Sequence, residues 1–235
     1  MTNPIFCALD TTDVAHAKQL ARALEGSVGG LKLGMEFFYA HGPDGYRQVA
    51  NEGAPIFLDL KLHDIPNTVA KAVASLMPLA PKIMTIHTQG GPEMMRRAAE
   101  AADQAAAHCG VDRPTLVGVT VLTSLDGDDL SAMGVDGAVE DHVVRLARLA
   151  KDSGLDGVVC SPMEVAAIRK ALGDDFHLVV PGIRPQGAAL GDQKRVMGPR
   201  QALDAGASSL VIGRPITQAD DPAEAARLIA DEIGC

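Results

Sequence analysis

Short apolar runs alternate along this chain with longer, alanine-rich amphipathic stretches. Eight runs are apolar enough to be buried strands, at positions 5–9, 30–33, 56–60, 83–87, 116–121, 157–160, 178–180 and 210–213. Continuous apolar runs of this length are typical of strands covered on both faces, as in a parallel sheet. The stretches between them predict helices at 14–24, 45–52, 69–76, 92–108, 140–152, 163–172, 199–205 and 222–232.

The helical segments carry the expected periodicity and boundary residues. In 140–152 the apolar side chains fall on one helical face and charged side chains on another. Several segments begin with a proline in the first turn and several are followed by a glycine, at Pro92, Pro199 and Pro222 and at Gly110, Gly154, Gly173 and Gly206. These signals separate the helices from the strands that follow.

Eight strand–helix units in a chain of 235 residues predict a (β/α)8 TIM barrel of the α/β class, forming a single domain over 1–235. A doubly wound open sheet is the alternative. It usually shows a GxGxxG turn after its first strand, whereas here the first strand ends in Leu9-Asp10-Thr11-Thr12. No linker or low-complexity stretch divides the sequence.

Composition and charge narrow the choice of partner. Hydrophobic residues make up 47% of the chain but aromatics only 3%, with no Trp, so the core must consist of Ala, Val, Leu, Ile and Met. The net charge of −9 disfavours nucleic-acid binding, which needs a basic surface. An anionic small molecule remains a suitable substrate, because a few basic side chains in a cleft can outweigh the overall charge.

Neither a secretory signal nor an apolar run of about 20 residues is present, so we expect a cytoplasmic protein without membrane contact. The four cysteines are scattered and form no CxxC or Cys/His cluster, which argues against structural zinc and redox chemistry. Cys7 and Cys160 lie in apolar runs and are expected to be core residues.

Polar residues gather where the predicted strands end, which is where barrel enzymes place their active sites. Asp10 follows the first strand, Lys32 lies on the second, and the third delivers Asp59 and Lys61, with Asp64 just beyond. Side chains two apart on a strand share a face, so Asp59 and Lys61 should point the same way. The fifth strand leads to Thr120, Thr123 and Ser124.

The two histidines of this region are expected to be structural. His63 should face away from Asp59 and Lys61, and His87, at the end of the fourth strand, is expected to be a hydrogen-bonded residue at the edge of the core.

The loops after the seventh and eighth strands are the expected phosphate region of a barrel. The seventh strand runs into Pro181 and Arg184, and the eighth into Gly213 and Arg214. Gln193 lies on the long segment 181–199, and loops of that length are usually functional. A glycine lets backbone amides approach an anion, and arginine binds its oxygens in pairs.

The alternating charges of Lys32, Asp59, Lys61 and Asp64 have two non-catalytic interpretations. One is a network of ion pairs that ties the barrel rim together. The other is a metal site formed by Asp59 and Asp64, against which the interleaved lysines argue, because an ammonium group competes with a cation.

At this point the residues resemble a known family. The run 59–68, Asp-Leu-Lys-Leu-His-Asp-Ile-Pro-Asn-Thr, is similar to the signature of the bacterial orotidine 5′-phosphate decarboxylases. Shorter segments at 8–10, 31–34, 119–124, 181–185, 191–193 and 212–217 match family elements in order, so the resemblance covers the whole chain.

The resemblance implies a carboxy-lyase that converts orotidine 5′-phosphate to UMP and CO₂ without a cofactor or metal, in pyrimidine synthesis. It makes Lys61 the proton donor, flanked by Asp59 and Asp64, with Lys32 in the same array and in contact with the ribose. It implies a homodimer in which Asp64, Ile65 and Thr68 enter the neighbouring site. The remaining substrate contacts that it implies are Asp10, Thr123, Ser124, Pro181, Arg184, Gln193, Gly213 and Arg214.

Two other functions stay open. Metal-dependent sugar-phosphate decarboxylases and aldolases share an Asp-x-Lys-x-x-Asp core, but they carry an acid near the position of Lys32 and lack the Ile-Pro-Asn-Thr ending. A barrel that binds nucleotides without turnover would carry the same motifs. One departure from the family pattern is Gly198 before Pro199, where Thr is frequent, and glycine is an acceptable helix cap.

Overall fold

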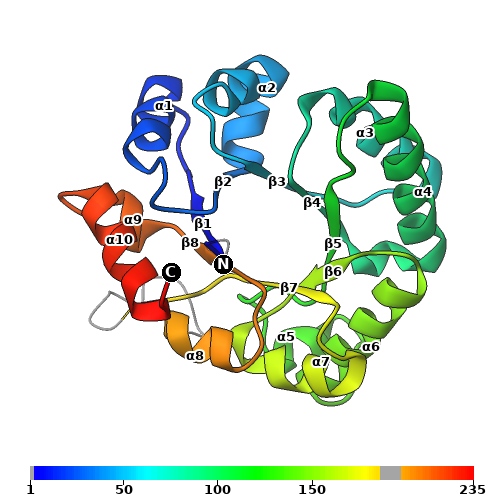
Figure 1. The fold of residues 1–235 in the computed structure, drawn as a ribbon. Helices are drawn as coiled ribbons and strands as arrows, with labels where there is room; N and C mark the ends of the chain where they lie inside the picture. Colours follow the sequence, from blue (N-terminus) through cyan, green and yellow to red (C-terminus); the bar gives the residue numbers. More distant parts are fainter. Residues whose placement is uncertain (1–2, 186–196) are drawn as a thin grey trace.

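The computed structural model describes residues 3–185 and 197–235. Eight parallel strands follow one another around a closed barrel, and the last pairs with the first (Figure 1). They are β1 (Ile5–Ala8), β2 (Gly30–Gly34), β3 (Ile56–Leu62), β4 (Ile83–His87), β5 (Thr115–Val119), β6 (Gly157–Val159), β7 (His177–Val180) and β8 (Ser209–Ile212). The predicted TIM barrel is confirmed, and the open-sheet alternative is wrong.

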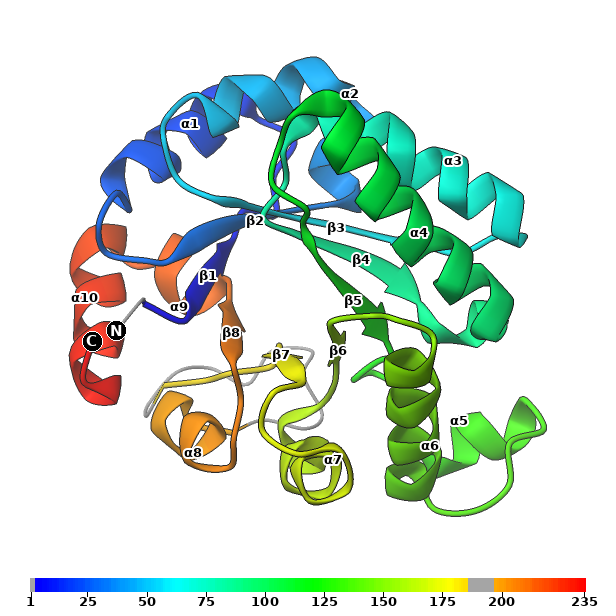
Figure 2. The same cartoon turned by 45° about the vertical axis from the view of Figure 1, so that its right-hand side comes forward.

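Helices surround the barrel as an outer ring (Figures 1 and 2). They are α1 (Val14–Ala23), α2 (Met35–Ala50), α3 (Pro66–Leu76), α4 (Gly91–Cys109), α5 (Gly127–Ala132), α6 (Val139–Asp152), α7 (Val165–Leu172), α8 (Pro199–Asp204), α9 (Arg214–Thr217) and α10 (Pro222–Ile233). Short 3₁₀ turns stand at Met77–Leu79, Thr88–Gly90 and Pro162–Glu164.

Three helical assignments differ from the sequence prediction. α2 begins ten residues earlier than expected, at Met35, and is broken at Gly42, whose φ is 57°. The helix resumes at Pro43, because proline is tolerated in the first turn of a helix. The Gly-Pro pair therefore puts a kink within α2 and does not mark where the helix begins. The short helices α5 and α9 span too few residues to show a helical period and were not predicted.

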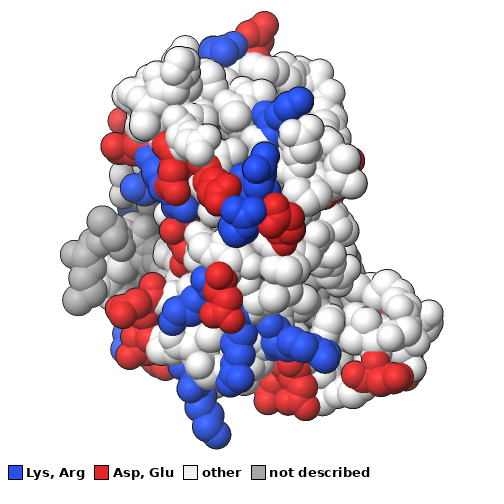
Figure 3. Space-filling view, turned by 90° about the vertical axis from the view of Figure 1, so that its right-hand side faces the viewer, with Lys and Arg blue, Asp and Glu red and all other residues white. Residues whose placement is uncertain are grey.

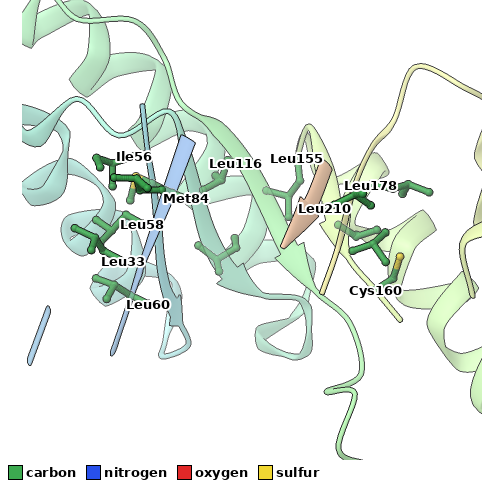
Figure 4. Packing of buried hydrophobic residues seen from close by; sticks show 14 of the residues in the cluster. Leu33, Ile56, Leu58, Leu60, Met84, Leu116, Leu155, Cys160, Leu178 and Leu210 are labelled. Carbon is green, nitrogen blue, oxygen red and sulfur yellow. The ribbon is translucent and has the colours of Figure 1, made fainter. Parts of the chain in front are cut away.

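The apolar core has two layers on the two faces of the sheet. The larger layer lies between strands and helices and includes Leu58, Leu116 and Leu178 (Figure 4). The smaller layer fills the barrel itself, with Phe6 and Phe57 meeting edge to face at a centroid distance of 5.9 Å. The expectation of a core made only of Ala, Val, Leu, Ile and Met is therefore wrong. Because the barrel interior is filled by side chains, the space for a ligand is displaced toward one end of the strands.

The expected core cysteines are buried. Cys7 is fully buried and Cys160 is 1% exposed, as predicted for residues within apolar strands. Burial raises the pKa of the Cys7 thiol to about 12, so this thiol stays protonated at neutral pH.

The surface carries both positive and negative charges. On the face shown in Figure 3, basic and acidic side chains lie interspersed, without a continuous basic area. Within residues 3–185 and 197–235, none of the helices combines the length and the apolar character that a bilayer crossing requires.

Candidate active site

Three of the predicted residues meet inside the barrel mouth. Asp59 on β3 lies between two ammonium groups, with its Oδ2 atom 2.8 Å from Nζ of Lys61 and 3.6 Å from Nζ of Lys32. Asp59 is 8% exposed and Lys32 is 9% exposed, so this carboxylate and this ammonium group are held close together largely out of water. Asp10, two residues beyond the end of β1, extends the array with an oxygen 3.3 Å from the Lys32 side-chain nitrogen.

The charge of Asp59 is maintained by its neighbours. Burial alone would raise its pKa, but the ammonium groups of Lys32 and Lys61 and hydrogen bonds from Lys61 and Thr85 outweigh this effect and hold the pKa below its usual value. The group is therefore a carboxylate at neutral pH, placed between the side-chain nitrogens of Lys32 and Lys61.

The backbone of β3 is irregular where it presents Lys61. Leu58 pairs with Met84 of β4, but the next paired residue is Leu62, opposite Ile86, so residues 59–61 of β3 stand opposite the single residue Thr85. Lys61 itself has φ of +51°, in the left-handed region that a lysine rarely adopts. Such a conformation costs about 1–3 kcal/mol, and strained residues of this kind cluster at active and ligand-binding sites.

The same face of the barrel encloses a cavity of about 180 Å³. Its floor is apolar and formed from barrel interior residues, and its polar wall is the array described above. The lining includes Lys32, Asp59 and Lys61, the floor residues Phe57, Val159, Val179 and Val211, and Thr123 and Pro181 at the rim. A flat, partly apolar ring fits a space with one charged wall and one apolar floor.

Two arginines lie near one another at the ends of β7 and β8. The positive charge of Arg214 acts on Arg184, whose pKa is lowered first by partial burial and then by this neighbour. Arg184 lies two residues after Gly182, which has φ of +76°. The backbone N–H of Arg184 donates to the carbonyl of Met197 at 3.0 Å. Two neighbouring cations at the ends of these strands favour binding of an anion.

Gly213 directly precedes Arg214 and lies against the acidic end of the array. A Cβ atom added there would lie 3.4 Å from Cβ of Ala8 and 3.8 Å from an oxygen of Asp10. Asp10 and Arg214 are thus brought to adjoining parts of the rim, as the sequence predicted. Gln193 lies outside the described residues.

The other predicted residues lie outside the array in the single chain. Asp64, Ile65, Thr68 and Ser124 are exposed, and Ile65 is exposed to 67%. Among the described residues no ion pair joins Asp64 to Lys61, and the Asp64 carboxylate accepts the backbone N–H of Ile65 at 2.7 Å.

The two histidines stack on each other. The rings of His63 and His87 lie 5.1 Å apart and nearly parallel. The expectation that His87 is fully hydrogen-bonded is wrong, because its Nδ1 atom is buried and makes no hydrogen bond within the described part of the chain. Burial first, and then the charges of His63 and Lys61, lower its pKa to about 4.

Two further residues shape the site and were not predicted. Thr85 bridges β4 and β3 through its hydroxyl group. Gly34 follows Lys32 on the same face of β2, and a Cβ there would lie 3.2 Å from the Lys32 ammonium nitrogen. The Lys-Leu-Gly sequence was a signal for Gly34, because a glycine two residues from a functional lysine leaves room for its head group.

The donor groups present do not resemble a metal site. Within residues 3–185 and 197–235 no three His, Cys, Asp or Glu side chains converge in a manner suited to a metal ion. The most buried carboxylate of the site, Asp59, is instead satisfied by two ammonium groups.

The chain matches the family model described as "Orotidine 5'-phosphate decarboxylase / HUMPS family" over residues 3–229. It is 56% identical over 232 residues to the orotidine 5′-phosphate decarboxylase of Rhodospirillum rubrum, covering 98% of this chain and 94% of that protein. It is 55% identical to that of Erythrobacter litoralis, covering 97% of each chain.

Solved structures agree with these matches. The crystal structure of orotidine 5′-phosphate decarboxylase from Lactobacillus acidophilus superposes with a TM-score of 0.84 at 36% identity, covering 99% of this chain and all of that one. An uncharacterized conserved protein from Geobacillus kaustophilus gives 0.86 at 35% identity, covering 98% of this chain and all of that one. The TIM-barrel fold, the full-length family match and relatives above 50% identity show that this chain belongs to the orotidine 5′-phosphate decarboxylase family.

Proposed function

We propose that this protein decarboxylates orotidine 5′-phosphate to UMP without a metal or organic cofactor, as the last step of pyrimidine nucleotide synthesis. The observation that carries the proposal is the buried Asp59 carboxylate between the ammonium groups of Lys61 and Lys32, at the wall of a cavity with an apolar floor. The names of the relatives support the same substrate.

The charge pattern suits the demands of this reaction. When CO₂ leaves C6 of the pyrimidine, the electron pair of the broken bond stays on C6 in the plane of the ring, where the ring π system cannot delocalise it. A cofactor that accepts electrons is one solution to such a problem, and an electrostatic environment built in advance is another. An ammonium group held by Asp59 beside the cavity supplies positive charge without rearrangement during the reaction.

Lys61 has a second role in this proposal. Its ammonium group transfers one proton to the C6 electron pair, which forms the C6–H bond of UMP, and the resulting amine regains a proton from solvent. Its side chain is half-buried and lines the cavity, so it meets both the substrate and water. Asp59 keeps the ammonium group aligned, and Lys32 holds the other side of the carboxylate.

The rest of the substrate would lie along the rim. Asp10 and Lys32 would bind the ribose hydroxyl groups, Thr123, Ser124 and Pro181 the pyrimidine, and Arg184, Gly213 and Arg214 the phosphate, with Gln193 as a further phosphate ligand. The effect of the Arg214 charge on Arg184 supports the phosphate end of this assignment. Binding energy from a phosphate far from C6 can be used to orient the reacting ring.

We further propose a homodimer in which Asp64, Ile65 and Thr68 complete the neighbouring site. All three residues are exposed, and Ile65 presents an apolar side chain directly after the β3 exit. A second carboxylate arriving from a partner would complete the Lys-Asp-Lys-Asp array of the family signature.

The test follows the loss of the orotate absorbance when protein is mixed with orotidine 5′-phosphate. The wild type should consume the substrate equally with and without a chelator, and Lys61→Ala should be slower by about 10³-fold or more, since both charge and proton are lost. Lys170→Ala removes an exposed lysine on the outer helix α7 and should behave as wild type.

Three results would contradict the proposal. Loss of turnover on chelation would favour the metal-dependent enzymes of similar sequence. A wild type that binds UMP tightly but does not consume orotidine 5′-phosphate would favour a nucleotide-binding barrel. A Lys61→Ala variant as active as Lys170→Ala would show that the ammonium group is not the proton donor.

A further inference from the structure

We propose that Thr85 is a positioning residue for the decarboxylation, one that sets the orientation of the Asp59 carboxylate and the backbone of Lys61 through a single hydroxyl group. The inference rests on the proposed function, because it assigns a role within the same site. Thr85 lies on β4 and is 1% exposed.

The direction of each hydrogen bond follows from the groups involved. The backbone N–H of Lys61 donates to Oγ1 of Thr85 at 2.8 Å, so this oxygen acts as an acceptor. A hydroxyl group has one proton, and the atom 3.0 Å away on the other side, Oδ1 of Asp59, belongs to a carboxylate that can only accept. The proton of Thr85 is therefore directed at Asp59.

These bonds complete a ring of three hydrogen bonds. The backbone of Lys61 donates to Thr85, Thr85 donates to Oδ1 of Asp59, and the ammonium group of Lys61 donates to Oδ2 of Asp59 at 2.8 Å. With Oδ1 occupied by Thr85, the opposite oxygen is left to the two lysines, and rotation of the carboxylate is opposed. The ring fixes Lys61 at its backbone and at its charged end.

The irregular strand explains why a side chain is needed here. Thr85 is the one residue of β4 opposite positions 59–61, and Lys61 has its left-handed backbone at this point. A strained conformation persists only where its surroundings hold it, and the Thr85 hydroxyl is a contact that does so directly. Without it, the Lys61 ammonium group would lose its defined position relative to the cavity.

The test compares Thr85→Val, which keeps the shape and removes the hydroxyl, with Thr85→Ser, which keeps the hydroxyl. Thr85→Val should lower kcat for orotidine 5′-phosphate about 10- to 100-fold, the size of effect expected for a displaced catalytic group, with KM changed less than about 3-fold. Thr85→Ser should stay within about 3-fold of the wild type. The acid limb of the pH profile should move to higher pH in Thr85→Val, because a bond that favours the charged form of Asp59 is lost.

Thr88→Val is the matched control, since Thr88 is also a fully buried threonine whose hydroxyl donates to a carbonyl, that of Val119, at 2.8 Å. It should lower thermal stability in the same way while its kcat and pH profile stay unchanged. If Thr85→Val does not fold, Thr85→Ala takes its place, and failure of both to fold while Thr88→Val folds would make Thr85 a folding residue and overturn the proposal.

Other outcomes are separable from the function itself. A Thr85→Val enzyme with wild-type kcat and pH profile would contradict the role of Thr85 only. A Thr85→Ser enzyme as slow as Thr85→Val would show that packing, not the hydroxyl group, matters. A wild type that leaves the substrate intact would contradict the proposed function instead.

Discussion

Arg169 on α7 joins three segments at the end of the barrel opposite the cavity. Its guanidinium donates to three backbone carbonyls and one hydroxyl group, those of Gly206 (2.7 Å), Gly173 (3.0 Å), Phe176 (2.5 Å) and Ser208 (2.8 Å). These residues lie just before β7 and β8 or in the turn that follows α7, which is the face of a TIM barrel associated with stability. We therefore predict that replacing Arg169 weakens the fold without altering the chemistry.

The size of the effect follows from the four bonds. Arg169 is partly exposed, so each bond is valued at about 1 kcal/mol, below the range for buried charged donors. Arg169→Met removes all four, about 4 kcal/mol, and the freed side chain regains about 1–2 kcal/mol of conformational entropy. A net loss of about 2–3 kcal/mol in the free energy of unfolding is expected, or about 4–12 °C in Tm for a chain of this size.

The measurement is urea denaturation followed by circular dichroism. Arg200→Met is the matched control, since Arg200 on the neighbouring helix α8 makes one exposed ion pair, with Asp204 at 3.0 Å. That variant should lose less than about 0.5 kcal/mol. Arg169→Lys should recover only part of the loss, because a single ammonium group cannot reach acceptors on both sides as the planar fork does.

A structural role for the four Arg169 hydrogen bonds would be contradicted if Arg169→Met lost no more stability than Arg200→Met. A purely structural role would also be contradicted if Arg169→Met changed kcat for orotidine 5′-phosphate at a temperature where the variant is fully folded. The first result would mean that water replaces the guanidinium at no cost. The second would mean that the two ends of the barrel are coupled.

Two further predictions concern the site and the assembly. Because the pKa of folded His87 is lowered to about 4, its NMR signals should remain those of a neutral ring at pH 5. The unfolded chain binds this proton near pH 6.5, so the free energy of unfolding should fall by about 1–2 kcal/mol as the pH decreases from 6.5 to 4, after allowance for partial exposure. The His87→Phe variant should not show this pH dependence. If Asp64 serves the neighbouring subunit, mixing inactive Lys61→Ala with inactive Asp64→Ala should restore activity through hybrid dimers, and an absence of recovery despite proven subunit exchange would contradict the shared site.

The fold was predictable because its signal is repeated along the chain. Each strand is a short apolar run with a helix after it, and eight repetitions predict a barrel even where individual ends are misplaced by a few residues. Elements without a period of their own were missed, as α5 and the first half of α2 illustrate. The rim residues Asp10, Lys32 and Arg214 were predictable for a related reason, since the ends of parallel strands must meet at one edge.

The arrangement around Lys61 shows where such prediction stops. Strand alternation predicts that Asp59 and Lys61 share a face, and their 2.8 Å ion pair agrees with that outcome. The cause is different, however, because β3 departs from regular pairing over these residues and Lys61 adopts a left-handed backbone. This geometry is held in part by the hydroxyl group of Thr85, which lies 24 residues further along the chain, on the next strand. The pattern of residues along one strand contains no information about that contact. The residues of the site can therefore be found from the sequence, but the hydrogen bonds that orient them depend on the neighbouring strand and become visible only in the structure.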